Sequence, residues 1–221
     1  MVKIDRTPTP PPSLAVEKTK ATGSYKKDDV VEQLASDFRG KCYLCEMDEL
    51  QSIEVEHLRP HHNGRNRDRM FDWNNLFYSC SHCNSVKNRG IYEKNVADCC
   101  TIDPETIIRQ EFLDGRVVVS NLVDTDEARV TASLVTDCFE LSNTPIRTKE
   151  CQVKVRALQR TMTTLYKALG KYQTEKTERT LRTLKGLLSR SYRFAGFTRT
   201  YVRSHIATYP DLAPFVALEE S

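Results

Sequence analysis

Two short segments, KCYLCE at residues 41–46 and SCSHCNSVKN at residues 79–88, carry the features that decide the fold. Each contains a Cys-X-X-Cys pair, and residues 46–79 separate the two pairs. A Cys-X-X-Cys turn directs two sulfurs to one ion, and four thiolates suit tetrahedral zinc. A site closed by four cysteines leaves no position for water, so we expect structural Zn²⁺ that joins two distant segments. The predicted ligands are Cys42, Cys45, Cys80 and Cys83.

The alternative for these four residues is a set of buried cysteines without a metal. The other four cysteines lack the paired spacing, and small buried side chains are the simplest interpretation of them. We therefore assign no metal to Cys99, Cys100, Cys138 or Cys151.

The chain divides by composition into four regions. Residues 1–27 are rich in proline, with PTPPP at 8–12, and predict an extended arm. Residues 28–95 form the zinc-stapled module, which begins with an amphipathic helix capped by Asp28 and ending at Gly40. Residues 96–147 are an acidic connecting region with short strands, because DGRVVVS at 114–120 combines an Asp-Gly turn with a β-branched run.

Residues 148–221 predict a basic helical region. Apolar residues recur at helical spacing in three stripes, so we expect two or three packed helices. The first stripe, near whose end Gly170 lies, is Leu158, Met162, Leu165, Tyr166 and Leu169. The second stripe is Leu181, Leu184 and Leu188, and the third is Phe194, Phe197, Tyr201, Val202 and Ile206, ahead of Pro210.

Charge is segregated along the chain. Residues 151–210 hold 13 Lys or Arg against two Glu, about +11, while the whole chain carries +3. A basic surface of this kind could bind nucleic acid, dock an acidic partner face, or be an ordinary solvated face. The charge count does not separate these three alternatives.

Composition excludes a membrane-embedded protein, because 39% of the residues are apolar and no run of 18 apolar residues occurs. The first residues are charged and proline-rich where an export signal needs an apolar stretch, so we expect a cytoplasmic protein. A reducing compartment favours metal binding over disulfides for the paired cysteines.

The residues between the cysteine pairs supply a second constellation. EVEH at 54–57 is typical of a strand end, where Glu56 and His57 point to opposite faces. Asn75 and Asn84 follow. This arrangement resembles the HNH nuclease family, which combines an acidic ligand, a His base, a central Asn and a helical Asn or His. The resemblance implies an α+β fold: a ββα-metal module with structural zinc, followed here by a mainly helical part.

The chemistry of phosphodiester hydrolysis explains these residue types. A neutral imidazole can take the proton of an attacking water, so His57 is the predicted general base. A hard divalent cation such as Mg²⁺ would neutralise the leaving oxygen, with Glu56 and Asn84 as oxygen ligands. Asn88 lies one helical turn after Asn84 and is a weaker third ligand. By resemblance, Asn75 orients His57 through hydrogen bonds.

Basic residues surround the motif and would attract a phosphate backbone. Arg59 and Lys87 are the predicted substrate contacts. The arginines of residues 63–70 are equally well explained as a solvated loop. Three further histidines are left without a role, because isolated histidines are more often solvent-facing or zinc-adjacent: His61, His62 and His82.

A closer resemblance joins the PPPSLA arm, the DVVEQL helix, the FRGKCYLCE pair and the CNSVKN helix. Together they are similar to the HNH subunit of Septu-type antiphage systems, some of which include a retron. That resemblance covers most of the first hundred residues and implies a bacterial defence nuclease that acts beside an ATPase partner. The alternative function is a non-catalytic zinc-stapled module that binds nucleic acid or a partner protein.

Overall fold

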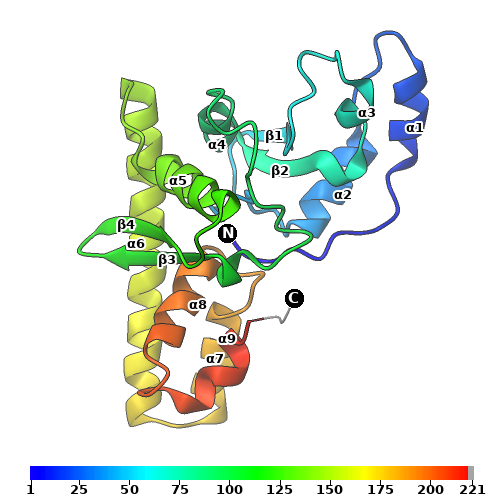
Figure 1. The fold of residues 1–221 in the computed structure, drawn as a ribbon. Coiled ribbons are helices and arrows are strands. Elements are labelled where there is room, and N and C mark those ends of the chain that lie inside the picture. Colours follow the sequence, from blue (N-terminus) through cyan, green and yellow to red (C-terminus); the bar gives the residue numbers. More distant parts are fainter. Residues whose placement is uncertain (219–221) are drawn as a thin grey trace.

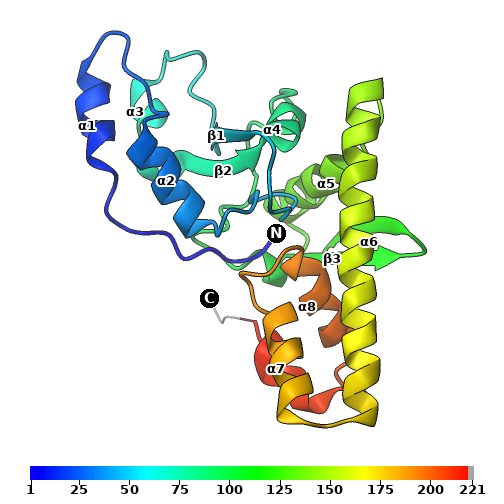
Figure 2. The ribbon, with the colours of Figure 1, turned by 180° about the vertical axis from the view of Figure 1, so that it is seen from behind.

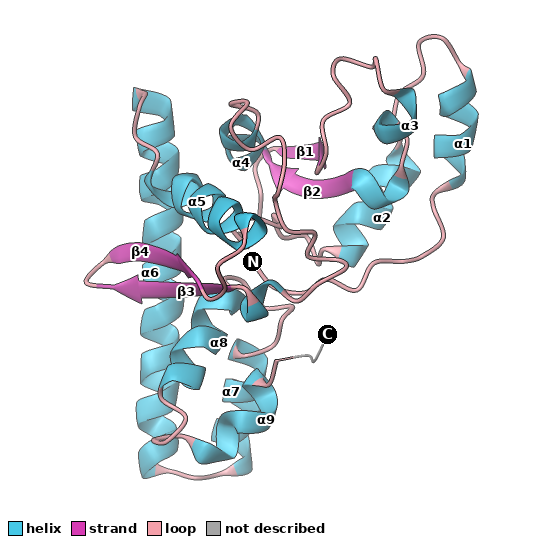
Figure 3. Ribbon diagram, viewed as in Figure 1, coloured by secondary structure: helices cyan, strands magenta, loops and turns pink. Residues whose placement is uncertain are grey.

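Figure 1 shows the computed structural model, which describes residues 1–218, as a mixture of helices and small sheets. The predicted α+β class is confirmed. The strands form two separate antiparallel pairs, β1 with β2 and β3 with β4, which stand out against the helices in Figure 3. Residues 219–221, the end of the predicted basic helical region 148–221, lie outside the described residues.

The unit that holds the cysteine pairs runs strand, strand, helix. Strand β1 (Ile53–His57) pairs with β2 (Leu76–Cys80), and His57 lies opposite Leu76 in the register. Helix α4 (Ser81–Lys87) follows β2 without a loop. Cys80 ends the strand and caps the helix, because its Sγ accepts the Cys83 backbone N–H at 3.4 Å. Between the strands lie α3 (Arg67–Met70) and the short helix η1 (Trp73–Asn75).

Helix α2 (Asp28–Asp37) packs its apolar face on β2. Val30, Leu34 and Phe38 are fully buried, and the Phe38 ring centroid lies 5.7 Å from that of Phe77. The predicted helix is confirmed, and the Gly40 N–H donates to the Ala35 carbonyl where the helix ends. The predicted Asp28 cap is wrong, since Lys27 occupies the cap position without a side-chain bond.

The predicted extended arm is wrong for part of residues 1–27. Residues Pro12–Thr19 form helix α1, which Pro12 can begin because the first turn of a helix needs no N–H from that residue. Ser13 ties α1 to α2 by donating from its backbone N and its Oγ to Asp29, at 3.1 and 2.6 Å. Earlier in the arm, the Arg6 guanidinium lies 4.7 Å from the Phe77 ring centroid, so the arm is packed onto the module.

The connecting region holds the predicted strand and an unpredicted helix. Strands β3 (Ile108–Leu113) and β4 (Arg116–Asn121) are joined by Asp114 and Gly115, both with positive φ, as a tight hairpin turn requires. The short helix η2 (Pro104–Thr106) precedes them, and α5 (Asp126–Glu140) follows them. Thr125 caps α5 through its side chain, and Ala128, Ala132, Val135 and Phe139 bury one face.

The basic region is helical as predicted. Helix α6 (Pro145–Thr174) runs from beside α5 to the far end of the molecule, past the β3–β4 hairpin (Figure 2). The predicted stripe is buried except for Tyr166, which is 40% exposed, and Gly170 lies inside the helix. The remaining elements are α7 (Glu178–Leu187), α8 (Ala195–Ser204), η3 (Pro210–Leu212) and α9 (Ala213–Val216).

Some of the opposite charges of the acidic and basic regions form ion pairs inside the molecule. The buried carboxylate of Glu105 pairs with Arg199 at 2.8 Å and with Arg203 at 2.7 Å, and Asp103 pairs with Arg190 at 2.5 Å. The acidic region and the basic helices therefore neutralise each other where they pack. The basic residues of α6, α7 and their connection that remain exposed are Lys149, Arg156, Arg160, Lys167, Lys171, Lys176, Arg179, Arg182 and Lys185.

No helix within residues 1–218 combines the length and the apolar character needed to cross a membrane.

Candidate metal centre and adjoining cavity

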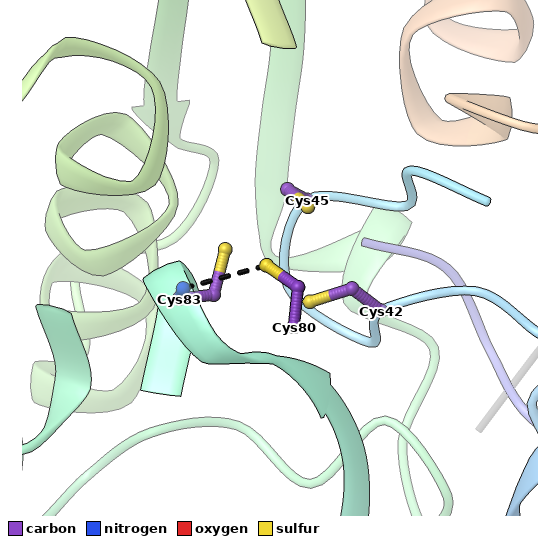
Figure 4. A group of neighbouring side chains, drawn as sticks. All are labelled: Cys42, Cys45, Cys80 and Cys83. Atoms are coloured by element: carbon purple, nitrogen blue, oxygen red, sulfur yellow. Dashed lines mark hydrogen bonds between the residues drawn. The ribbon is translucent and has the colours of Figure 1, made fainter. Parts of the chain in front are cut away.

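The four cysteines of the two pairs converge at one point. Their Sγ atoms all lie within 4.8 Å of one another, and all four residues are buried. Figure 4 shows one pair arriving from the loop before β1 and the other from the junction of β2 and α4. Tetrahedral zinc with bonds of about 2.3 Å separates its sulfurs by about 3.8 Å. This cluster, Cys42, Cys45, Cys80 and Cys83, could therefore hold a structural metal ion, as predicted.

The loop of the first pair is shaped by backbone bonds. The Glu46 N–H donates to the Cys42 carbonyl at 2.8 Å, and the Cys42 N–H donates to the Met47 carbonyl at 3.0 Å. The Tyr43 N–H donates to the Tyr78 carbonyl at 3.0 Å, which fixes the loop against β2. The first pair is therefore held beside the second by the sheet itself.

A lysine faces the thiols of the cluster. Burial raises the pKa of the Cys45 and Cys83 thiols well above their usual range, so both are protonated at neutral pH without a metal. The buried Lys154 of α6 faces this cluster: burial alone would lower its pKa, but thiolates at Cys83, Cys45 and Cys80 would outweigh burial and raise it. The ammonium of Lys154 would offset the excess negative charge of four thiolates around a divalent ion.

The remaining four cysteines are not among the thiols that converge within residues 1–218. Cys138 is buried next to Cys83, and the Cys151 Sγ lies 3.8 Å from His82 Nε2. Cys99 and Cys100 lie elsewhere, where the Arg6 Nε contacts the Cys100 Sγ at 3.5 Å. His82, which received no role, is thus buried beside the cluster.

A separate cavity of about 400 Å³ opens at the end of β1. We call it the His57 cavity. It gathers side chains from three parts of the chain: the arm, the end of β1 with the following loop, and α4. Its polar lining includes Tyr25, His57, His61, Asn84, Asn88 and Glu93.

The protonation state of the His57 imidazole is the one that a general base needs. Its Nε2 lies 3.1 Å from the Met70 carbonyl, which only accepts, so Nε2 carries the proton and Nδ1 keeps a free lone pair. Burial lowers the pKa of His57 to about 4, so the ring is neutral at pH 7. The Tyr25 ring packs edge-on against His57 with centroids 4.5 Å apart.

Asn75 acts on His57 through the backbone. Its Oδ1 accepts the Arg59 N–H at 2.7 Å, and its Nδ2 donates to the carbonyls of Arg59 and Arg69, both at 2.9 Å. Arg69 precedes Met70, whose carbonyl holds the His57 ring. Asn75 thus joins the end of β1 to the segment that orients His57. The resemblance implied hydrogen bonds that orient the imidazole, and here those bonds go to the backbone around the ring instead of to the ring itself.

Glu56 and His57 are neighbours on β1, where the strand period directs them to opposite faces, and both line the His57 cavity. It is buried, its Oε1 lies 2.7 Å from Lys87 Nζ, and its Oε2 accepts the Tyr43 hydroxyl at 2.7 Å. Lys87 is also buried and donates to the His57 carbonyl at 2.9 Å. The ammonium of Lys87 is therefore used inside the module, and its contact with substrate stays a prediction.

Asn84 and Asn88 share one face of α4 at the His57 cavity. The Asn88 Nδ2 donates to the Asn84 Oδ1 at 2.9 Å, and both residues line the cavity. Their predicted proximity is confirmed. The bond leaves the Asn88 Oδ1, and the second lone pair of the Asn84 Oδ1, available to a ligand.

Arg59 lies outside the His57 cavity. Its guanidinium donates to the Val96 carbonyl at 2.9 Å and lines an adjoining cavity of about 300 Å³. Arg67, the first residue of α3, bonds to carbonyls at the end of α1, including that of Lys18 at 2.7 Å, so it is a structural contact.

Several lining residues were missed by sequence reasoning. Tyr25 and Lys26 come from the segment expected to be an extended arm, and Lys26 pairs with Glu54 at 2.7 Å. His61 was left without a role. Its only sequence signal is its position four residues after His57, which is meaningful only once the loop is known to return over the strand end.

No protein-family model matches the chain, and no curated protein matches it.

Proposed function

We propose that this chain is a metal-dependent HNH nuclease that hydrolyses phosphodiester bonds of nucleic acid. The observation that carries the proposal is His57, a neutral imidazole with a free Nδ1, in a cavity shared with Asn84 and Asn88 of the helix that follows β2. The strand–strand–helix order and the four-cysteine cluster, which we assign to structural Zn²⁺, fit the same family.

In this proposal His57 takes the proton of the attacking water at Nδ1. A divalent cation such as Mg²⁺, held by Asn84 with Asn88 and Glu56, would supply charge neutralisation at the leaving oxygen. Tyr25 and the buried strand end keep the imidazole neutral by excluding water, since burial is the main cause of its lowered pKa. Asn75 holds the loop that aims the ring.

Glu56 is the residue that needs rearrangement. Both of its carboxylate oxygens are bonded, to Lys87 and to Tyr43. Direct ligation of a cation would require one oxygen to turn from its partner. This observation favours the second candidate, a zinc-stapled module that binds nucleic acid or a partner protein without cutting.

A cleavage assay separates the two candidates. Purified protein is incubated with supercoiled plasmid, single-stranded DNA and tRNA, each in magnesium and in EDTA. The nuclease proposal predicts cleavage of at least one substrate in magnesium and none in EDTA. Binding of a substrate without cleavage in any metal condition would support the second candidate.

We further propose that the nuclease serves bacterial antiphage defence in the cytoplasm beside an ATPase partner. Support comes from the Septu-like pattern of the first hundred residues, which includes the α2 segment packed on β2. The exposed bases of α6 and α7 suit an acidic partner face or a phosphate backbone. Co-purification with a co-expressed Septu-type ATPase, before and after charge reversal of Arg160 and Lys167, tests the partner.

A further inference from the structure

His61 is the second imidazole of the His57 cavity. It follows Pro60 in the loop after β1, and its ring centroid lies 4.4 Å from that of His57 with an interplanar angle of 56°. The Tyr25 ring lies against both, 4.5 Å from His57 and 5.9 Å from His61. The two histidines are therefore next to each other and open to the same space.

The loop after His61 fixes which nitrogen carries its proton. The Gly64 N–H donates to the His61 Nδ1 at 2.8 Å, so Nδ1 is unprotonated and the proton of the neutral ring is on Nε2. His62, Asn63 and Gly64 all have positive φ, which bends the backbone so that the Gly64 N–H returns to the ring. The Asn66 N–H then closes the loop on the His61 carbonyl at 3.0 Å.

The two rings thus present different groups. His57 donates through Nε2 to Met70 and keeps Nδ1 as an acceptor, whereas His61 accepts at Nδ1 and keeps an Nε2–H donor. That Nε2 has no hydrogen-bond partner within residues 1–218. Lys26, the cation that lines the cavity, is occupied by Glu54.

We propose that His61 contacts the substrate directly, donating from Nε2–H to a non-bridging oxygen of the scissile phosphodiester. This inference rests on the proposed nuclease function. A bond forms between the water oxygen and phosphorus, the bond to the leaving sugar oxygen breaks, and the water proton passes to His57 Nδ1. A divalent cation held by Asn84, Asn88 and Glu56 would offset the charge on the leaving oxygen. His61 stays neutral throughout and stabilises charge on the phosphoryl oxygen.

Protonation of His61 would leave the Nε2–H donor in place but would disrupt the loop that holds the ring. An imidazolium carries hydrogen on Nδ1, which would then face the Gly64 N–H instead of accepting it. Burial and the neighbouring His62 lower the pKa of His61, so the neutral ring with its Gly64 bond dominates at neutral pH. At neutral pH the two rings therefore present different groups to the cavity: the His57 Nδ1 can accept a proton or hydrogen bond, and the His61 Nε2–H can donate one.

The test compares wild type, His61→Ala, His61→Gln and the distant control His205→Ala in single-turnover cleavage with magnesium. We expect His61→Ala to be about 10- to 100-fold slower, since one donor to a charged oxygen is lost. His61→Gln places an amide donor near the same position and should recover part of the rate. His205→Ala should cleave like wild type. The acid limb of the pH–rate profile should persist in His61→Ala, because His57 remains the base, and it should move toward higher pH, because the neighbouring His61 helps to lower the pKa of His57.

A second measurement does not depend on turnover. Nitrogen-15 NMR of the imidazoles in metal-free buffer should show His61 as the Nε2–H tautomer, and addition of a dinucleotide phosphodiester should shift its Nε2 signal. A Nδ1–H tautomer, no shift, or a His61→Ala rate within twofold of wild type would overturn the proposal for His61. Absence of cleavage by wild type would instead contradict the nuclease function, whatever the tautomer.

Discussion

Lys87 on α4 and Glu56 on β1 form a buried ion pair, with 2.7 Å between Nζ and Oε1. Because the same ammonium donates to the His57 carbonyl, one lysine joins the helix to the strand on which both Glu56 and the predicted base lie. A residue that the sequence suggested for substrate contact thus organises the site from inside.

Removal of this cation should destabilise the module. Lys87→Met leaves the buried Glu56 carboxylate with Tyr43 as its one remaining partner, and an uncompensated buried charge costs about 3–5 kcal/mol. We expect the free energy of unfolding in urea to fall by that amount. Lys167→Met, on the exposed side of α6, is the control and should change it by less than about 0.5 kcal/mol. Equal stability of the two variants would contradict the structural role of Lys87.

The cysteine cluster predicts a metal stoichiometry. After dialysis, metal analysis should find about one zinc per chain, and Cys80→Ser should lose the ion and part of the stability. Cys100→Ser is the matched control, because Cys100 lies outside the four-thiol cluster. Zinc retained by Cys80→Ser, or lost equally by Cys100→Ser, would exclude the cluster as the zinc site.

Gly196 marks the place where the first cysteine loop meets α8. A Cβ at this position would lie 2.1 Å from Gln110 Nε2 and 2.7 Å from Glu46 Oε1, and the Gly196 N–H donates to that carboxylate at 3.1 Å. Gly196→Ala should therefore lower the melting temperature and cost about 1–3 kcal/mol. Gly186→Ala, in an α7 position with nothing near the added Cβ, should instead stabilise by about 0.5–1 kcal/mol. Stabilisation by both would show that α8 is not packed against the loop.

Acidification should reduce stability through two buried histidines. Burial lowers the pKa of His57 and of His82 to about 4, whereas an unfolded histidine titrates near 6.5. Between these values the unfolded chain binds protons that the folded chain does not, so stability falls as the pH drops from about 6.5 to 4. The loss is at most about 3 kcal/mol for each ring.

Chemical denaturation at several pH values measures this loss. His82→Gln should reduce the slope between pH 6.5 and 4 without changing the acid limb of cleavage, which follows His57. A slope that is the same in both proteins would show that His82 titrates normally in the folded state.

Local sequence features predicted the cysteine cluster, the two-residue hairpin turn and the buried stripe of α6. Each depends on spacing within a short segment, which the chain encodes directly. The Asn84–Asn88 contact is similar, because one helical turn sets it. Helix α1 was missed because its prolines resemble an extended segment, although Pro12 suits a first turn. Helix α5 carried a usable signal in the Thr125 cap.

The contacts that shape the site arise from tertiary packing. Nothing near Tyr25 in the sequence indicates that it lies against His57, and His61 becomes informative only through the Gly64 bond. Burial of Lys87 depends on α4 crossing the end of β1. Likewise, sequence alone assigns Arg199 to the basic surface. In the fold its guanidinium forms a buried ion pair with Glu105, which lies far away along the chain.

The most direct test of the proposed chemistry is cleavage by wild type and by His57→Ala, both prepared with equal zinc content, on the same substrate in magnesium. Loss of a general base lowers rates by about 100- to 10,000-fold, so we predict that His57→Ala is at least 100-fold slower at a temperature where both proteins are folded, with its zinc content unchanged. Cleavage by His57→Ala at the wild-type rate would contradict the assignment of the active site to the His57 cavity.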